Sequence, residues 1–214
     1  MAIRRGGMQT PTAASSVFAI DTQSQTSAPY AISNFPVDMA LRKDTDGSST
    51  DVHARLTQGK GMFANSVNAE GSDNIAQFDY QNGYLDNTSQ DSTKYAWMWK
   101  RARGYFDVTT WTGTGSARTV SHNLGAVPEM MWVKKRSSGD DWFVYVGSLG
   151  NTNKLELNST SASGSAAVGG NQLWNSTTPT SSVFSVSDNV RVNESGETYI
   201  AYLFATVAGV SKVG

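Results

Sequence analysis

The 214-residue sequence predicts an all-β protein made of two tandem antiparallel β-sandwich units of jelly-roll type, preceded by an extended N-terminal arm. Short apolar runs alternate with segments rich in Ser, Thr, Asn and Gly, which is typical of turn-rich β proteins. No stretch of useful length has helical periodicity. A third observation gives the number of units, because residues 94–108 recur near the C-terminal end as residues 200–213.

The repeat aligns without a gap at a shift of 105 positions, so that Trp97 corresponds to Tyr202 and Trp99 to Phe204. Three earlier segments also repeat, at shifts of 88, 92 and 93: residues 17–23 as 105–111, 35–43 as 127–135, and 62–72 as 155–165. Because the repeated segments keep their order, we divide the chain into an arm (residues 1–16), unit 1 (17–104) and unit 2 (105–214).

The arm is small and polar, and it lacks the apolar residues that a core of its own would need. In unit 1 we expect strands at residues 17–22, 29–34, 38–43, 52–57, 61–66, 76–80 and 94–100. Unit 2 follows the same order and is longer, mostly at 166–182. The closing strands, 94–100 and 199–204, are nearly continuous in apolar residues, so we expect both of their faces to be covered. Residues 211–214 resemble the start of a third unit.

Composition argues against several classes of function. Only 16% of the residues are charged and the formal net charge is -1, so no basic excess favours a nucleic-acid partner. There is no cysteine and there are two histidines, which leaves little for thiol, imidazole or metal chemistry. No apolar run approaches the ~18 residues of a membrane span. We therefore expect a soluble protein made in a cytoplasm, without a cofactor, membrane insertion or enzymatic activity.

An acidic segment, residues 44–51, has the look of a calcium-binding loop. Asp44, Asp46 and Asp51 supply carboxylates, but the glycine stands at the fourth position and no glutamate stands at the twelfth. A hairpin turn built on Asp46 and Gly47 explains the same residues, and we favour it over a metal site.

Tryptophans give the candidate ligand contacts. Trp174 lies in the longer part of unit 2 and is the best candidate for an exposed aromatic contact, although an indole folded back as a plug fits equally well. Asp141 precedes Trp142, and a carboxylate beside an aromatic ring suits a sugar. Because adjacent strand residues point to opposite faces, a turn followed by a core tryptophan is the favoured alternative.

A small basic cluster stands at the junction between the units. The second copy of this segment, at 205–208, has none of these charges, so the cluster is particular to the junction. A solvated strand end is the simplest explanation, and contact with an acidic neighbour is the sharper one. The residues that we expect to contact a partner are Arg4, Arg5, Lys100, Arg101 and Arg103.

Four segments of unit 2 resemble a domain that recurs in tandem in virion proteins of tailed bacteriophages, many of them marine and cyanobacterial. They are residues 105–136, which begin Tyr-Phe-Asp-Val-Thr-Thr-Trp-Thr-Gly-Thr-Gly and end Val-Pro-Glu-Met-Met-Trp-Val-Lys-Lys-Arg, then Trp-Asn-Ser-Thr-Thr-Pro-Thr-Ser-Ser-Val-Phe at 174–184, Thr-Tyr-Ile-Ala-Tyr-Leu-Phe at 198–204 and Gly-Val-Ser-Lys-Val-Gly at 209–214. Unit 1 matches more loosely, through 35–43 and 94–108.

The resemblance implies a structural protein on the virion exterior, most directly a tail fibre or its virion-proximal portion, made in the host cytoplasm. It implies other virion proteins as partners, a homotrimer, and no catalytic residue. A capsid decoration protein is a variant of this hypothesis. A module that binds a host surface glycan, through Trp174 and the Trp142–Asp141 pair, is the alternative from another class.

Overall fold

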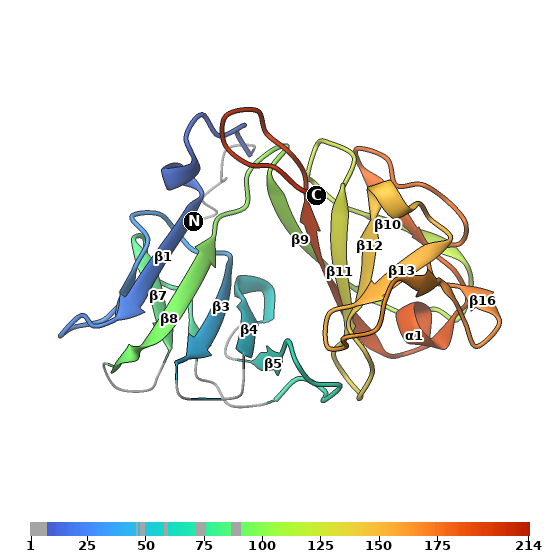
Figure 1. Ribbon diagram of the computed structural model, residues 1–214, viewed down its shortest axis with the longest axis horizontal. Coiled ribbons are helices and arrows are strands. Elements are labelled where there is room, and N and C mark those ends of the chain that lie inside the picture. Colours follow the sequence, from blue (N-terminus) through green and yellow to red (C-terminus); the bar gives the residue numbers. More distant parts are fainter. Residues whose placement is uncertain (1–7, 46, 48–49, 58–59, 72–75, 87–90) are drawn as a thin grey trace, which may run out of the picture.

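The computed structural model describes residues 8–45, 47, 50–57, 60–71, 76–86 and 91–214, and Figure 1 shows two β-sandwich units side by side. The expected all-β class and sandwich architecture are confirmed. Among the described residues, no helix is long and apolar enough to cross a membrane.

In the described part of unit 1, eight strands form two sheets, a five-stranded one in the order β1-β8-β3-β4-β5 and a three-stranded one in the order β2-β7-β6. The strands are β1 (Phe18–Gln23), β2 (Ala31–Ile32), β3 (Met39–Asp44), β4 (Thr50–Ala54), β5 (Gly61–Phe63), β6 (Ala76–Gln77), β7 (Gly83–Asp86) and β8 (Asp91–Trp99). Two 3-10 turns, η1 (Ala14–Ser16) and η2 (Arg55–Thr57), accompany them.

Unit 2 has a six-stranded sheet in the order β14-β13-β12-β11-β18-β9, with the pairs β10-β17 and β15-β16 beside it. Its strands are β9 (Phe106–Thr112), β10 (Arg118–Ser121), β11 (Met130–Lys135), β12 (Phe143–Val146), β13 (Asn153–Glu156), β14 (Gly164–Ser165), β15 (Ala167–Val168), β16 (Asn171–Gln172), β17 (Val183–Val186) and β18 (Thr198–Phe204). Its helical elements are η3 (Gly147–Leu149) and the short α1 (Val190–Asn193), which Asn189 caps through its side chain.

The repeat governs the topology. The order β1-β8-β3-β4-β5 in unit 1 recurs as β9-β18-β11-β12-β13 in unit 2. The turns that follow β8 and β18 recur as well, with the bridge Ala102 to Phe106 matching the bridge Val207 to Ser211. Each turn holds a glycine at positive φ, 75° at Gly104 and 76° in the second copy, a conformation that other residues rarely adopt.

One expected alignment is wrong by a residue. Met39 on β3 pairs with Trp99, and Met130 on β11 pairs with Phe204, which is the second copy of Trp99. The structural shift at this strand is therefore 91 (130 − 39) and not 92. Since side chains alternate along a strand, the slip matters: the counterpart of Leu41 is Trp132, on the same face, and not Val133.

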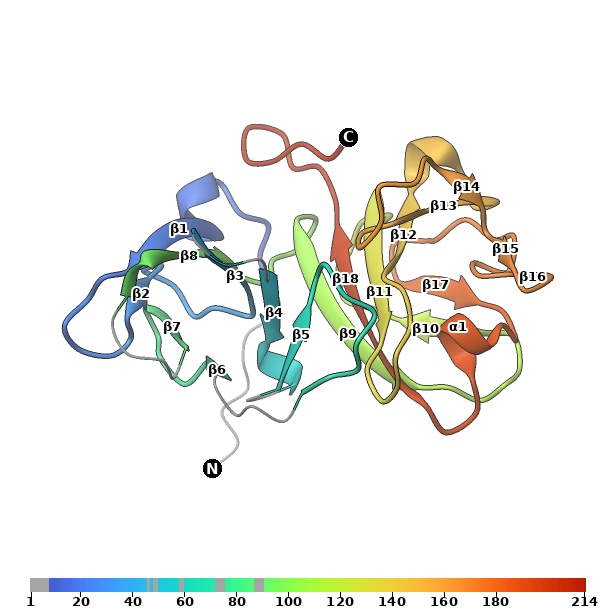
Figure 2. The ribbon, with the colours of Figure 1, turned by 60° about the horizontal axis from the view of Figure 1, so that its bottom comes forward.

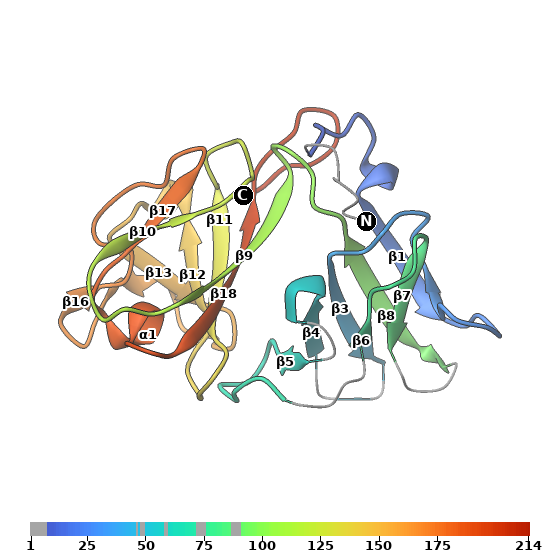
Figure 3. The ribbon, with the colours of Figure 1, turned by 180° about the vertical axis from the view of Figure 1, so that it is seen from behind.

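Each unit has a core between its two sheets, and seen from behind the smaller sheets lie over the larger ones (Figure 3). A third buried cluster lies between the units. On β18, side chains alternate between the core of unit 2 and this third cluster, so the expectation that both faces are covered is confirmed there. On β8 it holds only in part, because Met98 is buried while Trp97 is half-buried and Tyr95 is exposed.

The arm is described from Met8 onward and packs on its own chain. The backbone N–H of Arg103 donates to the carbonyl of Gln9 (3.1 Å), and η1 leads into β1. Arg4 and Arg5 lie outside the described residues.

Candidate functional site

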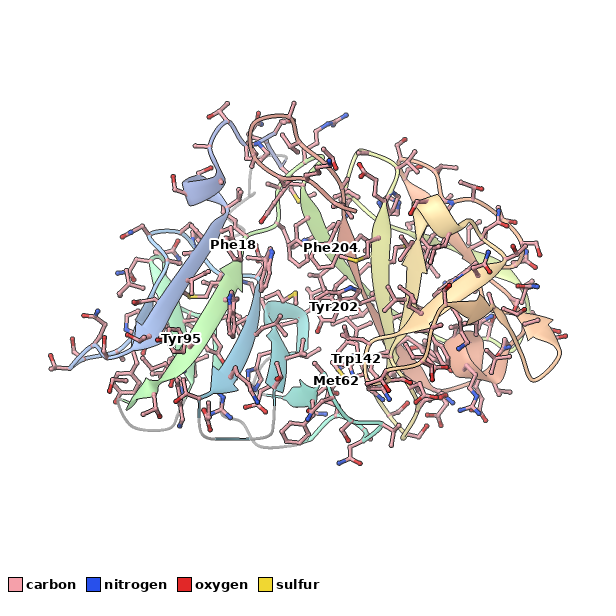
Figure 4. All side chains as sticks on the ribbon, in the orientation of Figure 1. Phe18, Met62, Tyr95, Trp142, Tyr202 and Phe204 are labelled. Carbon is pink, nitrogen blue, oxygen red and sulfur yellow. The ribbon has the colours of Figure 1, made fainter. Side chains whose placement is uncertain are left out.

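The junction between the units is the most elaborate site in the described chain. We call its buried apolar residues, from both units, the junction cluster, and Figure 4 shows Met62 of unit 1 meeting Trp142 and Tyr202 of unit 2. The buried members are Val17, Met39, Val52, Ala54, Met62, Ala102, Tyr105, Phe106, Val108, Trp142, Ile200, Tyr202 and Phe204. Burial of this many apolar side chains fixes the two units against each other.

Aromatic rings run through the junction cluster from one unit to the other. The ring centroids of Phe18 and Trp99 lie 5.0 Å apart in unit 1, and that of Trp99 lies 6.5 Å from the ring centroid of Phe106 in unit 2. The series continues from Phe106 to Phe204 at 5.1 Å and from Phe204 to Trp132 at 5.0 Å. Each distance falls within the range in which aromatic pairs attract beyond simple burial.

Polar contacts from unit 2 clamp the loop that follows β5. The indole N–H of Trp142 donates to the carbonyl of Phe63 (2.9 Å), and Lys134 Nζ donates to the carbonyl of Val67 (3.1 Å). Arg136 binds both carboxylate oxygens of Glu70 at 2.9–3.1 Å. Bidentate arginine–carboxylate contacts fix geometry as well as adding attraction, so this loop is held in one register.

Lys134 is the unusual member of this clamp. Its side chain is buried, and burial lowers its pKa from 10.5 to about 8, while the carboxylates of Asp140 and Asp141 oppose the shift and Lys135 adds to it. Its Nζ also donates to the carbonyl of Asp140 at 2.8 Å. The ammonium is thus held by carbonyl oxygens of both units.

The basic cluster at the junction divides into an internal part and an exposed part. The Arg101 guanidinium pairs with Asp107 (2.5 Å), which is fully buried, and its backbone N–H donates to Asp38 (2.8 Å). Arg101 therefore links the units from within, because a buried carboxylate needs a paired cation, and it is not presented to a partner as expected. Lys100 is half-buried and Arg103 is exposed.

Two hollows of about 870 and 570 Å³ flank these residues. Met8 and Arg101 line both; Lys100 lines the larger, and Arg103 and His122 line the smaller. The arm, which is continuous with Arg4 and Arg5, thus reaches the basic cluster at Met8. Arg4 and Arg5 themselves lie outside the described residues, so the structure brings together only Lys100, Arg101 and Arg103 of the expected partner contacts.

The imidazole of His122, which lines the smaller hollow, is neutral. Its Nδ1 accepts from the backbone N–H of Leu124 (3.2 Å), which leaves Nε2 to donate to the carbonyl of Thr180 (3.2 Å). Burial lowers the pKa of His122, and the contact with Thr180 and the charge of Asp107 oppose that shift. Positive charge in the hollow therefore comes from the arginines.

The tryptophans expected to contact a ligand are internal. Trp174 is 1% exposed, its indole N–H donates to the carbonyl of Asn153 (3.1 Å), and its ring packs edge-on against Tyr145. The plug is therefore the correct interpretation and the exposed contact is wrong. Trp142 is fully buried in the junction, and Asp141 instead accepts from Asn158 Nδ2 (2.9 Å). A buried ring offers no face to a sugar.

The acidic segment joins β3 to β4 as a hairpin, with Lys43 paired to Thr50. Asp51 is buried and forms an ion pair with Arg42, so its carboxylate is engaged within the hairpin. Asp44 ends β3, and Asp46 lies outside the described residues. In the part of the chain that the structure describes, no three His, Asp or Glu side chains gather as a metal site.

Sequence reasoning missed the clamp residues Glu70, Lys134 and Arg136. A signal was present for Glu70, because the aligned position in the other unit holds Ser163, whereas Thr45 becomes the counterpart of Arg136 only at the shift of 91 that the structure gives. A charge present in only one copy of a repeat marks a position whose surroundings differ between the copies. The junction is where such positions occur.

Comparison with known protein families finds a match to one family model. The model of a family described as a domain of unknown function, DUF7483, matches residues 43–214, which is most of the chain and includes both sides of the junction. No curated protein matches the sequence, and no solved structure matches the fold.

Proposed function

We propose that this chain, which belongs to the DUF7483 family, is a structural component of a bacteriophage virion, most directly part of a tail fibre or its virion-proximal portion. The observation that carries the proposal is the junction cluster with its polar clamps. Two sandwich units that share a buried interface move as one stiff piece, as an element that transmits force or spans a distance requires. The phage-like segments of unit 2 supply the biological setting.

The proposal assigns the chain neighbouring virion proteins as partners, a homotrimeric state, a place on the virion exterior, and no catalytic role. The partner surface is the basic hollow beside the arm, where Arg103 is exposed and Lys100 half-buried. An acidic segment of a neighbour fits this surface by charge. A capsid decoration protein would use the same surface. The glycan alternative loses its named contacts, since Trp142 and Trp174 are buried.

Peptide mass spectrometry and immunogold labelling of intact, purified phage particles test the proposal. We expect the chain in the particles and the label on the tail; a label on the capsid favours decoration, and the absence of the chain from purified particles refutes both. Arg103→Glu should lower incorporation, because it reverses the charge offered to the neighbour. Arg118→Glu, on β10 and away from the hollow, is the matched control and should incorporate normally.

A further inference from the structure

The two units use different parts of equivalent surfaces at their junction. Unit 1 contributes β4, β5, η2 and the loop that follows β5, and Figure 2 shows β4 and β5 on the side toward unit 2. It also contributes the adjoining part of its larger sheet, through Phe18, Met39, Leu41 and Trp99. Unit 2 contributes chiefly β9 and β18, which are the second copies of β1 and β8. The interface is therefore offset with respect to the repeat: β4 and β5 of unit 1 contribute to the junction cluster, whereas their second copies, β12 and β13, contribute no residue to it.

On the same sheet face of unit 1, Phe18, Leu41 and Trp99 pack on the junction cluster, and the part of the face farther from the junction is uncovered. Ile20 on β1 is 54% exposed, whereas its counterpart Val108 is buried in the junction cluster. Tyr95 on β8 is 40% exposed, whereas its counterpart Ile200 is fully buried. Trp97, half-buried, pairs directly with Ile20, and its ring centroid lies 6.3 Å from that of Tyr95. We call Ile20, Tyr95 and Trp97 the acceptor face.

In unit 2 the second copies of β4, β5 and η2 are β12, β13 and η3. None of their residues belongs to the junction cluster in the described chain. Leu149, at the end of η3, is 38% exposed, and its counterpart at the end of η2 is the buried Thr57. Leu157, just after β13, is 37% exposed, and its counterpart Ala64 packs on the junction cluster. We call Leu149 and Leu157 the donor edge.

These exposures are not scattered singly. Of the eight large apolar side chains that the described residues expose, four fall on the acceptor face and the donor edge, which are the two surfaces that the internal junction covers in its own copies. Isolated exposed apolar residues are ordinary, but residues gathered on two surfaces with a known mode of contact indicate an interface.

We propose that copies of this chain associate head to tail by repeating the internal junction, with the donor edge of one copy covering the acceptor face of the next. The acceptor face is continuous with the junction cluster, since Phe18 on β1 and Leu41 on β3 already pack on it. The inference rests on the homo-oligomer of the proposed function and names its surfaces. A heterologous contact closes into a ring when its rotation allows, and three copies would give the trimer.

The contact between copies is weaker than the internal one. Of the polar clamps only the lysine has an equivalent in the other unit, Lys43 for Lys134, because Thr50 stands for Trp142, Thr45 for Arg136 and Ser163 for Glu70. What remains is chiefly apolar side chains and the exposed loop after β13. Association should therefore depend on concentration and persist at high salt, since it buries apolar area and no ion pair.

Analytical ultracentrifugation of the full chain tests this inference. The mass of the unaltered protein should rise with concentration, and Ile20→Asp or Leu157→Asp should each leave a monomer. An equimolar mixture of these two variants should give dimers and nothing larger, because one variant keeps the donor edge and the other keeps the acceptor face. Val190→Asp, at an exposed position on α1 away from both surfaces, is the control and should assemble normally.

A second measurement uses the absence of cysteine from the chain. Ile20→Cys and Leu157→Cys, mixed under oxidising conditions, should form a disulfide-linked dimer of the two variants in excess of either homodimer. Circular dichroism and an unchanged melting temperature establish that each variant is folded, as expected for substitutions at exposed positions.

Three results would overturn the inference. The first is an unaltered protein that stays monomeric at every concentration, the second is Leu157→Asp that still self-associates, and the third is Val190→Asp that disrupts assembly equally. A monomer that is nonetheless present in purified particles would overturn the head-to-tail contact alone and leave the virion assignment standing. If the variants mix as expected but the chain is absent from purified particles, the head-to-tail contact stands and the virion assignment is refuted.

Discussion

Tyr199 and Tyr202 on β18 are both fully buried, yet their hydroxyl groups have opposite surroundings. The Tyr199 hydroxyl accepts from the backbone N–H of Glu194 (2.8 Å) and donates to the carbonyl of Val190 (3.0 Å). The Tyr202 hydroxyl lies in the junction cluster and has no hydrogen-bond partner among the described residues, while Trp142 stacks on its ring. One substitution, tyrosine to phenylalanine, therefore gives a matched pair with opposite expected signs.

Tyr202→Phe should stabilise the protein. A buried polar group without a partner costs about 1–3 kcal/mol, and phenylalanine removes that group while keeping the ring that packs between the units. Some of the gain is offset by the small space that the oxygen leaves, so we expect a net gain of about 1 kcal/mol. Tyr199→Phe should lose about 1–3 kcal/mol, because it leaves a backbone donor and acceptor unpaired.

Urea denaturation with an unchanged slope, together with calorimetry, measures both effects. For a chain of this size 1 kcal/mol corresponds to about 2–4 °C in melting temperature, so the two variants should lie on opposite sides of the unaltered protein. Burial also raises the pKa of Tyr202, so its proton is kept in the folded state and stability falls as pH rises above 10. Tyr202→Phe should reduce that fall. A loss of stability equal to that of Tyr199→Phe would refute the reasoning.

Three further predictions concern the clamps and the plug. Arg136→Leu should destabilise the protein by about 3 kcal/mol, because it leaves the buried carboxylate of Glu70 without its main partner. The double substitution Arg136→Leu with Glu70→Leu should cost less, because no unpaired carboxylate remains. Equal losses of stability for the two variants would contradict an ion pair. Lys134 binds its proton less tightly in the folded state (pKa about 8) than in the unfolded state (10.5), so the free energy of unfolding should rise with pH between about 8 and 9.5. Lys134→Met should flatten that rise, and an unchanged slope would contradict the assignment. Trp174→Ala should cost about 3–5 kcal/mol by opening a cavity in the core of unit 2, and unfolding near that of the unaltered protein would place the indole at the surface.

The repeat allowed much of the fold to be predicted from the sequence, because equivalent segments of the two units become equivalent strands in the same order. The apolar run at 199–204 was correctly expected to have both faces covered. The alignment at 35–43 was one residue out, since the segments before β3 and β11 allow either shift and only the pairing of Met39 with Trp99 decides between them. Sequence similarity alone does not show that one copy has an extra residue before the paired strand.

The site was less predictable. Trp174 lies in a part of unit 2 that has no counterpart in unit 1, so the repeat gave no information about its burial. Arg101 was expected to face outward as part of a charged cluster. Its partners, Asp38 and Asp107, stand on different units, and no local pattern reports a contact made by folding two units together. Contacts of this kind become visible only in three dimensions.

The two copies of the aromatic strand explain how a repeat can build an asymmetric junction. Trp97 and Tyr202 occupy equivalent positions in the larger sheets of the two units, but the Trp97 ring is half-buried and the Tyr202 ring is enclosed by the neighbouring unit. Sequence differences follow the surroundings: Arg101 contacts Asp38 and Asp107 at the junction, whereas its counterpart Thr206 is uncharged. Since the face itself is kept apolar in both copies, unit 1 retains the surface that unit 2 uses for packing. That retained surface is the physical basis on which a second copy can bind.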